Sequence, residues 1–280
     1  MKKIIKEIKD IESRLESSIE NKKIIESMET LVSLEQTCAQ IAQAWSGGWL
    51  GYHAFIYKRD LKPRKPGESF DLEWGQYGAF GNTSTGEWSE FDPEALVQQI
   101  YAASSLTNPN SIFDLESDLE DAFQNAKDDL IIVFEANALS ADAFLAATLE
   151  EWKGSQSHIS YSDYVTLLVG KKQLITRDQR AVQGSLQVPP HIRVLGRVIE
   201  FKSHISSIQE LLKLARKATK YIEARESSIT RRIAVSSVTG NKIFLGHGRS
   251  ALWRELKDLL SERLWTTPNS TGSQQLESVP

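Results

Sequence analysis

The sequence contains almost no cysteine, and this restricts the sites that it can form. Cys38 is the only cysteine among 280 residues, so an intramolecular disulfide and a cysteine-based zinc site are both excluded. Its neighbours Thr37 and Ala39 continue a helical pattern, which favours a buried structural thiol over a nucleophile. A chain with one cysteine also suits a reducing cytosol.

A long apolar run is missing as well. The longest one, LIIVFEANAL, contains Glu135 and is shorter than the roughly 18 residues that a membrane-spanning helix needs. Near the N-terminus, Lys6, Glu7 and Asp10 interrupt the region where a signal peptide has its apolar core. We therefore expect a soluble, cytoplasmic protein without a membrane partner.

The sequence also lacks an excess of positive charge and any close pair of histidines. Its net charge is −4 and its pI is ≈ 5.8, which argues against a nucleic-acid partner because binding phosphates requires a basic surface. No GxSxG nucleophile motif occurs. We therefore assign no catalytic residue, no metal site and no required cofactor. The histidines, which are too far apart for a local metal motif, are His53, His158, His191, His204 and His247.

The first 43 residues carry a helical pattern. Ile4, Ile8, Ile11 and Leu15 follow the 4-3-4 spacing of a coiled-coil stripe, which then slips at Ser18. The pattern predicts one helix or a helical hairpin over residues 1–43. Its apolar stripe packs on the rest of the chain, forms a coiled coil that makes a homo-oligomer, or lies on a membrane surface, a reading that its mixed acidic and basic residues disfavour. The sequence leaves these readings open.

Residues 44–229 read as an α-rich mixed domain that begins with a loop-rich segment over residues 45–91. This segment has many glycines and poor periodicity, and it holds four of the seven tryptophans. Its aromatic residues form a small core, a ligand-sensing pocket or a protein interface, with Arg59, Arg64, Glu68 and Glu73 as polar neighbours. The pocket reading uses Trp45, Trp49, Tyr52, His53, Tyr57 and Trp74.

Cap and breaker residues predict several helices beyond this segment. Asp92 is a suitable N-cap, with Pro93 at the first position of a helix that reaches about Ser105. Ser111 and Ser140 are candidate caps for two further helices, the second of which ends at Gly154. The run LIIVFEANAL fits a buried strand or a helix equally well.

The second half of this domain mixes strand and helix signals. The stretches YVTLLVG and IRVLGRVIEF are rich in β-branched and other apolar residues and predict strands, separated by Pro189 and Pro190. A strong helix follows, with Ser206 or Ser207 as its cap. Residues 230–240 are polar and read as a linker.

Residues 241–265 combine a buried strand, a glycine-bracketed turn and an amphipathic helix. The strand is KIFLG, the turn is Gly246-His247-Gly248, and the helix is SALWRELKDLLSERL with Ser250 as its cap. The free backbone N–H groups of a helix in this position suit a phosphate, and Arg249 adds a positive charge. From the residues alone, a phosphate site and a plain structural turn both stay open.

The stretch KIFLGHGRSALWRELKDLLSERL resembles the opening of the TIR-like (Toll/interleukin-receptor-like) domain of predicted bacterial nucleotide-binding proteins, some of them anti-phage defence effectors. The upstream stretches WSGGWLGYHAFIY and PGESFDLEWG resemble a region that precedes such domains. The resemblance implies a flavodoxin-like α/β fold with NAD or a related nucleotide as the ligand. It assigns part of the nucleotide site to Gly246, His247, Gly248, Arg249 and Ser250.

Active members of the wider superfamily hydrolyse NAD with an acidic residue that lies well downstream of this first helix. No position here matches that residue, and Glu255 and Glu262 lie on the first helix, where they cannot replace it. A doubly wound domain needs on the order of 100 residues, so we expect a TIR-like segment truncated after its first strand and helix. The Ser/Thr-rich residues 266–280 read as a disordered tail.

The sequence thus predicts an α+β protein, mainly helical at its N-terminus, with an incomplete flavodoxin-like part at its C-terminus. The expected function is that of a truncated, defence-related TIR-like protein with an N-terminal sensing or assembly region and no complete NAD-hydrolase site. Two alternatives remain: a non-enzymatic interaction or oligomerisation protein, and a small-ligand sensor that uses the aromatic region.

Overall fold

The computed structural model describes residues 2–76 and 83–238, with side chains as far as Thr230. The chain divides into two compact units, Met1–Glu226 and Ser227–Pro280. The fold and the sites below belong to the first unit. The predicted TIR-like segment 241–265 and the predicted tail 266–280 lie outside the described residues.

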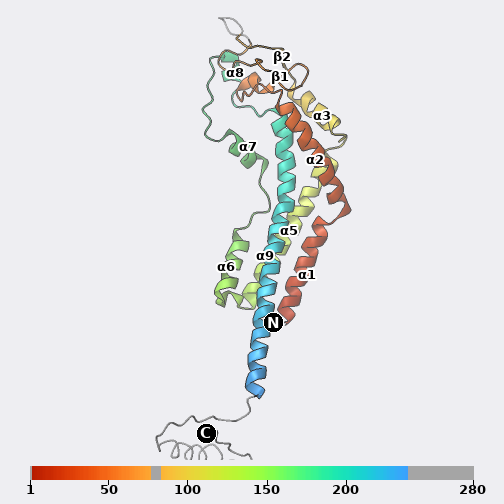
Figure 1. The fold of residues 1–280 in the computed structure, drawn as a ribbon, viewed down its shortest axis with the longest axis vertical. Helices are drawn as coiled ribbons and strands as arrows, with labels where there is room; N and C mark the ends of the chain where they lie inside the picture. Colours follow the sequence, from red (N-terminus) through yellow and green to blue (C-terminus); the bar gives the residue numbers. More distant parts are fainter. Residues whose placement is uncertain (1, 77–82, 239–280) are drawn as a thin grey trace, which may run out of the picture. The chain divides into compact units, whose positions relative to one another are not determined.

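The described part is mostly helical, with one small two-stranded sheet (Figure 1). None of its helices has an apolar stretch long enough to cross a bilayer. In chain order, the elements are α1 (Lys2–Ile19), α2 (Lys22–Ala42), η1 (Gly51–Phe55), β1 (Ile56–Lys58), β2 (Trp88–Glu90), α3 (Pro93–Ala103), α4 (Asn110–Phe113), α5 (Leu115–Ala136), η2 (Leu139–Ala141), α6 (Ala143–Gly154), α7 (Tyr161–Val169), α8 (Gln179–Gln183) and α9 (Pro190–Val238).

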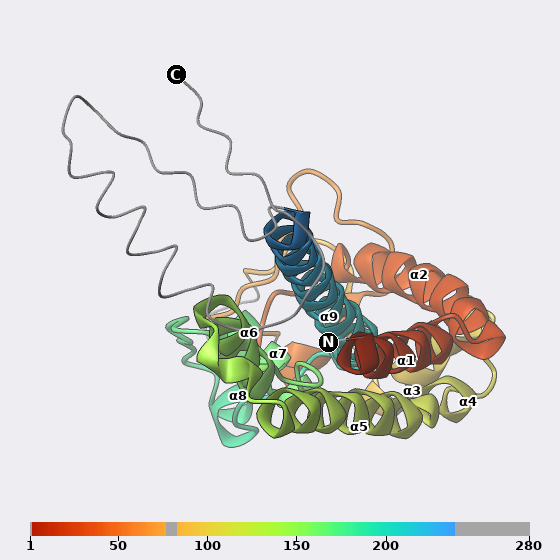
Figure 2. The same cartoon turned by 90° about the horizontal axis from the view of Figure 1, so that it is seen from below.

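Two helices occupy the N-terminal range in which a helix or a hairpin was expected. The chain turns between α1 and α2 at Asn21, whose side chain accepts a hydrogen bond from the Lys23 backbone N–H. The stripe residues Ile8, Ile11 and Leu15 are buried, and α1 lies along α5 and α9 (Figure 2). The apolar stripe of α1 is therefore covered within the chain.

Polar contacts beside this stripe fix α1 between its two neighbours. Lys9 pairs with Glu223 of α9 at 2.7 Å, and Arg14 pairs with Asp129 of α5 at 2.5 Å. The side chains of both pairs are about half exposed, so solvent screens them and they contribute little to the stability of the fold. They set the position of α1, while burial of the stripe supplies most of the driving force.

The ambiguous run LIIVFEANAL is helical and forms the end of α5. Leu130 and Phe134 are buried four residues apart, whereas Ile132 is 62% exposed. A strand would have placed all three side chains on one face, because strand side chains repeat every two residues. Phe134 packs edge-on against Trp152 of α6, with ring centroids 4.4 Å apart, and this contact belongs to the main core.

The two stretches predicted as strands are helices, so those predictions are wrong. YVTLLVG lies in α7, and IRVLGRVIEF lies in the first turns of α9. Val194, Val198, Phe201 and Ile205 are all buried, and their spacing of four and three residues is helical rather than alternating. Burial of this stripe outweighs the weak strand preference of valine and isoleucine.

The predicted start of the long helix is also wrong, and so is the linker over residues 230–238. Pro190 occupies the first turn of α9, where its missing N–H costs nothing, so the proline pair begins the helix. Ser206 lies inside α9 and donates a hydrogen bond to the carbonyl oxygen of Lys202. The same helix continues as far as Val238.

The caps follow the sequence signals only in part. Asp92 caps α3 as predicted, by accepting a hydrogen bond from the Ala95 N–H at 2.8 Å, with Pro93 at the first position. Asp142, rather than Ser140, caps α6, which ends at Gly154 as expected. Ser111 is not a cap: it lies within α4 and bonds the Asn108 carbonyl.

The tryptophan-rich segment forms a second, smaller core at one end of the helices. Strands β1 and β2 pair antiparallel, with Ile56 opposite Glu90 and Lys58 opposite Trp88. The stretch GYHAFIYK, which fitted a strand or a helix end, contains both η1 and β1. This core consists of Tyr52, Ile56, Phe70, Trp88 and Ala181.

Candidate functional site

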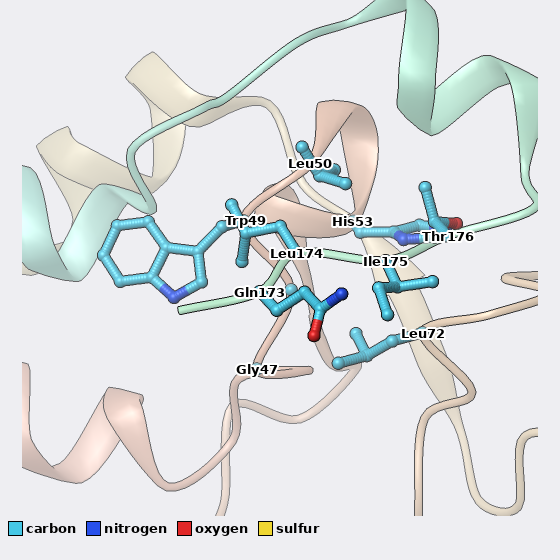
Figure 3. A pocket seen from close by; sticks show the side chains of 10 residues that line it. Gly47, Trp49, Leu50, His53, Leu72, Gln173, Leu174, Ile175 and Thr176 are labelled. Atoms are coloured by element: carbon cyan, nitrogen blue, oxygen red, sulfur yellow. The ribbon is translucent and has the colours of Figure 1, made fainter. Parts of the chain in front are cut away.

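A cavity of about 150 Å³ opens beside the tryptophan-rich segment (Figure 3). One wall is the turn from Gly47 to Leu50 together with His53, and Leu72 contributes an apolar side chain. The facing wall is Gln173–Thr176, from the segment between α7 and α8. Of the six aromatic residues predicted to form a pocket, Trp49 and His53 line this cavity.

The first wall is a glycine turn held by one serine. The Ser46 hydroxyl donates to the His53 carbonyl at 2.7 Å and accepts from the Gly48 N–H at 3.1 Å. Gly47 has a φ of +91°, a backbone conformation that glycine adopts without strain. The two hydrogen bonds of Ser46 therefore hold the turn in the conformation that places Trp49 and His53 on one side of the cavity.

The second wall is tied to the loop around Trp74. The Arg177 N–H donates to the Glu73 carbonyl at 2.8 Å, and the Arg177 guanidinium pairs with the Glu73 carboxylate at 2.6 Å. That guanidinium also lies 5.3 Å from the centre of the Trp74 ring. Trp74 therefore holds the facing wall in place instead of lining the cavity.

Asp178 forms a buried polar centre under both walls. Its Oδ2 accepts a hydrogen bond from the Tyr52 hydroxyl at 2.5 Å and lies 3.2 Å from His53 Nε2. Burial opposes ionisation of this carboxyl, but the hydrogen bonds from Tyr52 and His53 outweigh it and lower the pKa of Asp178. Burial also lowers the pKa of His53, and Asp178 offsets this only in part. His53 thus faces the cavity as a neutral imidazole at pH 7.

The other two predicted pocket residues belong to the core behind the first wall. Tyr57 is fully buried, and its hydroxyl lies 2.8 Å from His191 Nδ1. Burial lowers the pKa of His191 to about 3 and raises the pKa of Tyr57, so both groups stay neutral. Trp45 packs edge-on between Trp49 and His191, with centroid distances of 5.5 Å and 5.2 Å. This packing fixes the orientation of Trp49.

None of the four polar neighbours predicted for the pocket lines the cavity. Glu73 holds the facing wall through Arg177, as described above, and Glu68 pairs with the Lys58 ammonium at 2.5 Å, where both side chains are largely buried. Arg64 lies over the Trp88 ring at 5.6 Å, and Arg59 pairs with Glu87 at 3.8 Å.

The lone thiol is inert: Cys38 is buried as predicted, and burial raises its pKa to about 12.

The facing wall of the cavity has no signature in the sequence. Gln173, Leu174 and Ile175 lie more than 100 residues beyond Trp49 and follow no period, so no local signal connects the two segments. Lys172, whose ammonium lies 5.8 Å from the Trp49 ring, gives a cationic edge beside an aromatic face. A ligand that suits this edge has a planar group to stack on Trp49 or an electron-rich group to contact Lys172.

The size and lining of the cavity limit the ligand that it can hold. Ligand pockets for drug-sized molecules measure roughly 300–1,000 Å³, so about 150 Å³ accommodates one ring or a small polar group but not a whole dinucleotide. Its lining supplies the Gln173 amide, the Thr176 hydroxyl and the imidazole of His53, and no nucleophile paired with a base.

The residues assigned to the nucleotide site by resemblance lie outside the described part of the chain. They are Gly246, His247, Gly248, Arg249 and Ser250.

Of the metal-binding residue types among residues 2–76 and 83–238, one group lies close enough to share an ion: Glu120, His158 and His204. It lies apart from the cavity.

Comparisons with protein-family models, with curated proteins and with solved structures found no match. Functional inference therefore rests on the residues of this chain and on the geometry described above.

Proposed function

We propose that this chain is a nucleotide-responsive signalling protein of bacterial defence type, with a helical sensing region and a TIR-like segment that binds NAD or a related nucleotide. The proposal rests on the sequence of the stretch Gly246–Ser250: its predicted turn, the positive charge of Arg249 and the predicted helix N-terminus suit a phosphate. Helix α9 is described as far as Val238, and the predicted TIR-like segment starts three residues later in the sequence, at Asn241.

One observation supports a sensing role for the helical region: Trp49, which lines the cavity, and the nearby Gly51 are hydrogen-bonded to residues just before the start of α9. The Gln187 N–H donates to the Trp49 carbonyl at 2.8 Å, and the Gly51 N–H donates to the Ser185 carbonyl at 2.7 Å. Pro190, where α9 begins, is three residues beyond Gln187. A ligand that moves Trp49 therefore acts on the start of α9 through two short hydrogen bonds.

The nucleotide site is tested by calorimetry on the 280-residue chain with NAD, ADP-ribose and AMP. We expect Arg249→Ala to weaken binding about tenfold or more, because a charge-assisted hydrogen bond to phosphate is lost. Arg254→Ala, which removes the same charge from the helix that follows, is the matched control and should bind like the wild type. Equal binding by both variants, or no binding by the wild type, contradicts the nucleotide site.

The cavity is tested separately with Trp49→Ala and Trp49→Phe. If the cavity accepts the ring of a nucleotide or a smaller planar ligand, Trp49→Ala weakens that binding several-fold while Trp49→Phe, which keeps an aromatic face, largely preserves it. Binding that depends on Arg249 but not on Trp49 would assign the ligand to the C-terminal segment alone.

The same preparation should not turn over NAD, because no position in this sequence matches the acidic catalytic residue of the active superfamily members. Release of nicotinamide by the purified chain, abolished by a point mutation in it, would overturn that expectation. The competing function is a non-enzymatic interaction or oligomerisation protein. Light scattering decides it: an oligomer that binds no nucleotide favours this alternative.

A further inference from the structure

Two histidines and a glutamate from distant parts of the sequence meet beside α9. Glu120 lies on α5, His204 lies on α9, and His158 lies in the segment between α6 and α7. His158 Nδ1 is 3.1 Å from Glu120 Oε2, and His204 Nδ1 is 3.5 Å from the same oxygen. One candidate ligand atom from each residue lies within 4.8 Å of the other two.

The buried histidine of this cluster has a nitrogen without a hydrogen bond. His204 is 4% exposed, and its Nδ1, close to Glu120, has no hydrogen-bond partner. Buried side-chain nitrogens nearly always have a hydrogen-bond partner, so the free His204 Nδ1 indicates that another group binds there. A metal ion is such a group, since a neutral imidazole offers it a lone pair.

The two rings lie against each other and close to one carboxylate. They stack with centroids 4.3 Å apart and an interplanar angle of 24°, and each Nδ1 lies within 3.5 Å of Glu120 Oε2. Because the lone pairs of stacked imidazoles lie in nearly parallel planes, binding of one ion by both rings requires His158 to turn.

The surrounding charges favour a divalent cation. Arg197 of α9 is paired with Glu116 at 2.7 Å and also with Glu200, so its charge is more than balanced. With Glu120, the three carboxylates and one guanidinium carry a formal net charge of −2. A cation between Glu120 and the two imidazoles would compensate this excess.

We propose that Glu120, His158 and His204 form a zinc site that ties the segment between α6 and α7 to α5 and α9. Zinc binds nitrogen and oxygen ligands at about 2.0–2.1 Å, which places neighbouring ligands in a tetrahedral shell roughly 3.3 Å apart. The contacts of 3.1 Å and 3.5 Å lie on either side of this value. His158 is half-buried, which leaves solvent access for a water molecule as the fourth ligand.

The segment carrying His158 has the freedom to complete the coordination. Glu120 and His204 are fixed on two long helices, whereas His158 lies on a short connection. This connection is bonded to Lys127 of α5 at Ser155 and to Ser203 of α9 at Ile159. Its Nδ1 also lies 2.9 Å from the Ser157 hydroxyl, a contact that coordination would replace. Small adjustments of this connection therefore suffice.

The test uses the untagged 280-residue chain, stripped with a chelator and titrated with Zn²⁺ by calorimetry. We expect one equivalent to bind with micromolar or tighter affinity, and Co²⁺ in its place to give the intense visible absorption of a tetrahedral site. Glu120→Gln and His158→Ala should each weaken zinc binding more than tenfold. The matched control is Asp121→Asn, which removes the same charge from the neighbouring exposed residue and should bind like the wild type.

Circular dichroism and melting of each zinc-free variant separate loss of the site from loss of the fold. Zinc should raise the melting temperature of the wild type and of Asp121→Asn, but not that of Glu120→Gln or His158→Ala. Absence of stoichiometric zinc binding, or equal binding by all variants, overturns the proposal. In that case the cluster is a histidine–glutamate hydrogen bond without a metal.

Discussion

At the scale of single residues, His191 in the core behind the cavity makes the stability of the fold depend on pH. It is buried against Tyr57 and Trp45, and its pKa of about 3 in the folded chain lies far below the unfolded value of about 6.5. Between these two values the unfolded chain binds more protons than the folded chain. His191 therefore destabilises the fold as the pH falls from about 6.5, and has no such effect above it.

We expect the pH dependence of stability to report this directly. A single group titrating only in the unfolded chain changes the free energy of unfolding by about 1.4 kcal/mol per pH unit. Urea denaturation at pH 7, 6, 5 and 4 should show a decline that is shallower by about that slope in His191→Gln than in the wild type. Parallel declines would mean that His191 is protonated in the folded chain.

Gly51 is a second position at which one residue controls local structure. Its φ is +48°, and a Cβ atom there would overlap the backbone of Ala181 in α8. Gly67 has a φ of +85° but no atom within 4 Å of such a Cβ. The two glycines therefore share the conformational requirement and differ in the close backbone contact.

The same substitution at both positions separates these effects. Gly67→Ala should cost about 1–2 kcal/mol of unfolding free energy, from left-handed backbone strain alone. Gly51→Ala should cost at least about 2 kcal/mol more, because α8 must move away and the small core with it. Chemical denaturation of both variants measures the difference, and equal costs would show that α8 yields freely.

At the scale of elements, helix α1 is stabilised by the chain's own core. Ile11 is buried between α1 and its neighbours, whereas Ile25 on α2 is 52% exposed. Ile11→Ala should cost about 2–5 kcal/mol, since it leaves a cavity, and Ile25→Ala should cost about 0.5 kcal/mol or less. Urea denaturation measures both. If the α1 stripe instead formed an intermolecular coiled coil, Ile11→Ala would change the oligomeric state in light scattering.

The elements also show which sequence signals determine structure and which do not. Asp92-Pro93 predicts the start of α3 because both residues act through local geometry. IRVLGRVIEF misleads because strand preference is weak, whereas burial of Val194 and Val198 on one helical face depends on the whole core. The same reasoning explains why apolar spacing predicted the helices at the N-terminus but not the start of α9.

In the candidate sites, too, some residues are predicted from the sequence and others come together only through tertiary contacts. Trp49 and His53 were recognisable from the aromatic cluster, because tryptophan and histidine together are distinctive in one short segment. Their facing wall, Gln173–Thr176, and the cluster of His158 with His204 arise from tertiary contacts between distant segments, and no spacing in the sequence encodes them. Only the folded chain brings these residues together.

At the scale of the whole molecule, the first unit holds a complete core. The buried apolar residues of the main cluster extend from Ile8 to Ile222, and all of them lie within Met1–Glu226. Residues beyond Glu226 contribute none of the described core. A chain of residues 1–226 therefore contains every described side chain that supports the hydrophobic interior.

We expect this shortened chain to fold on its own with one cooperative unfolding transition. Its free energy of unfolding should lie within about 1 kcal/mol of that of the same transition in the 280-residue chain, because it keeps every buried apolar side chain that the structure describes. A chain of residues 1–209 is the control: it loses Leu211, Ala215 and Ile222 from the core and should not fold stably. Circular dichroism with urea denaturation measures all three chains. If residues 1–226 fold but bind nucleotide as the full chain does, the nucleotide site lies in the helical region; we expect instead that the fold persists and nucleotide binding is lost.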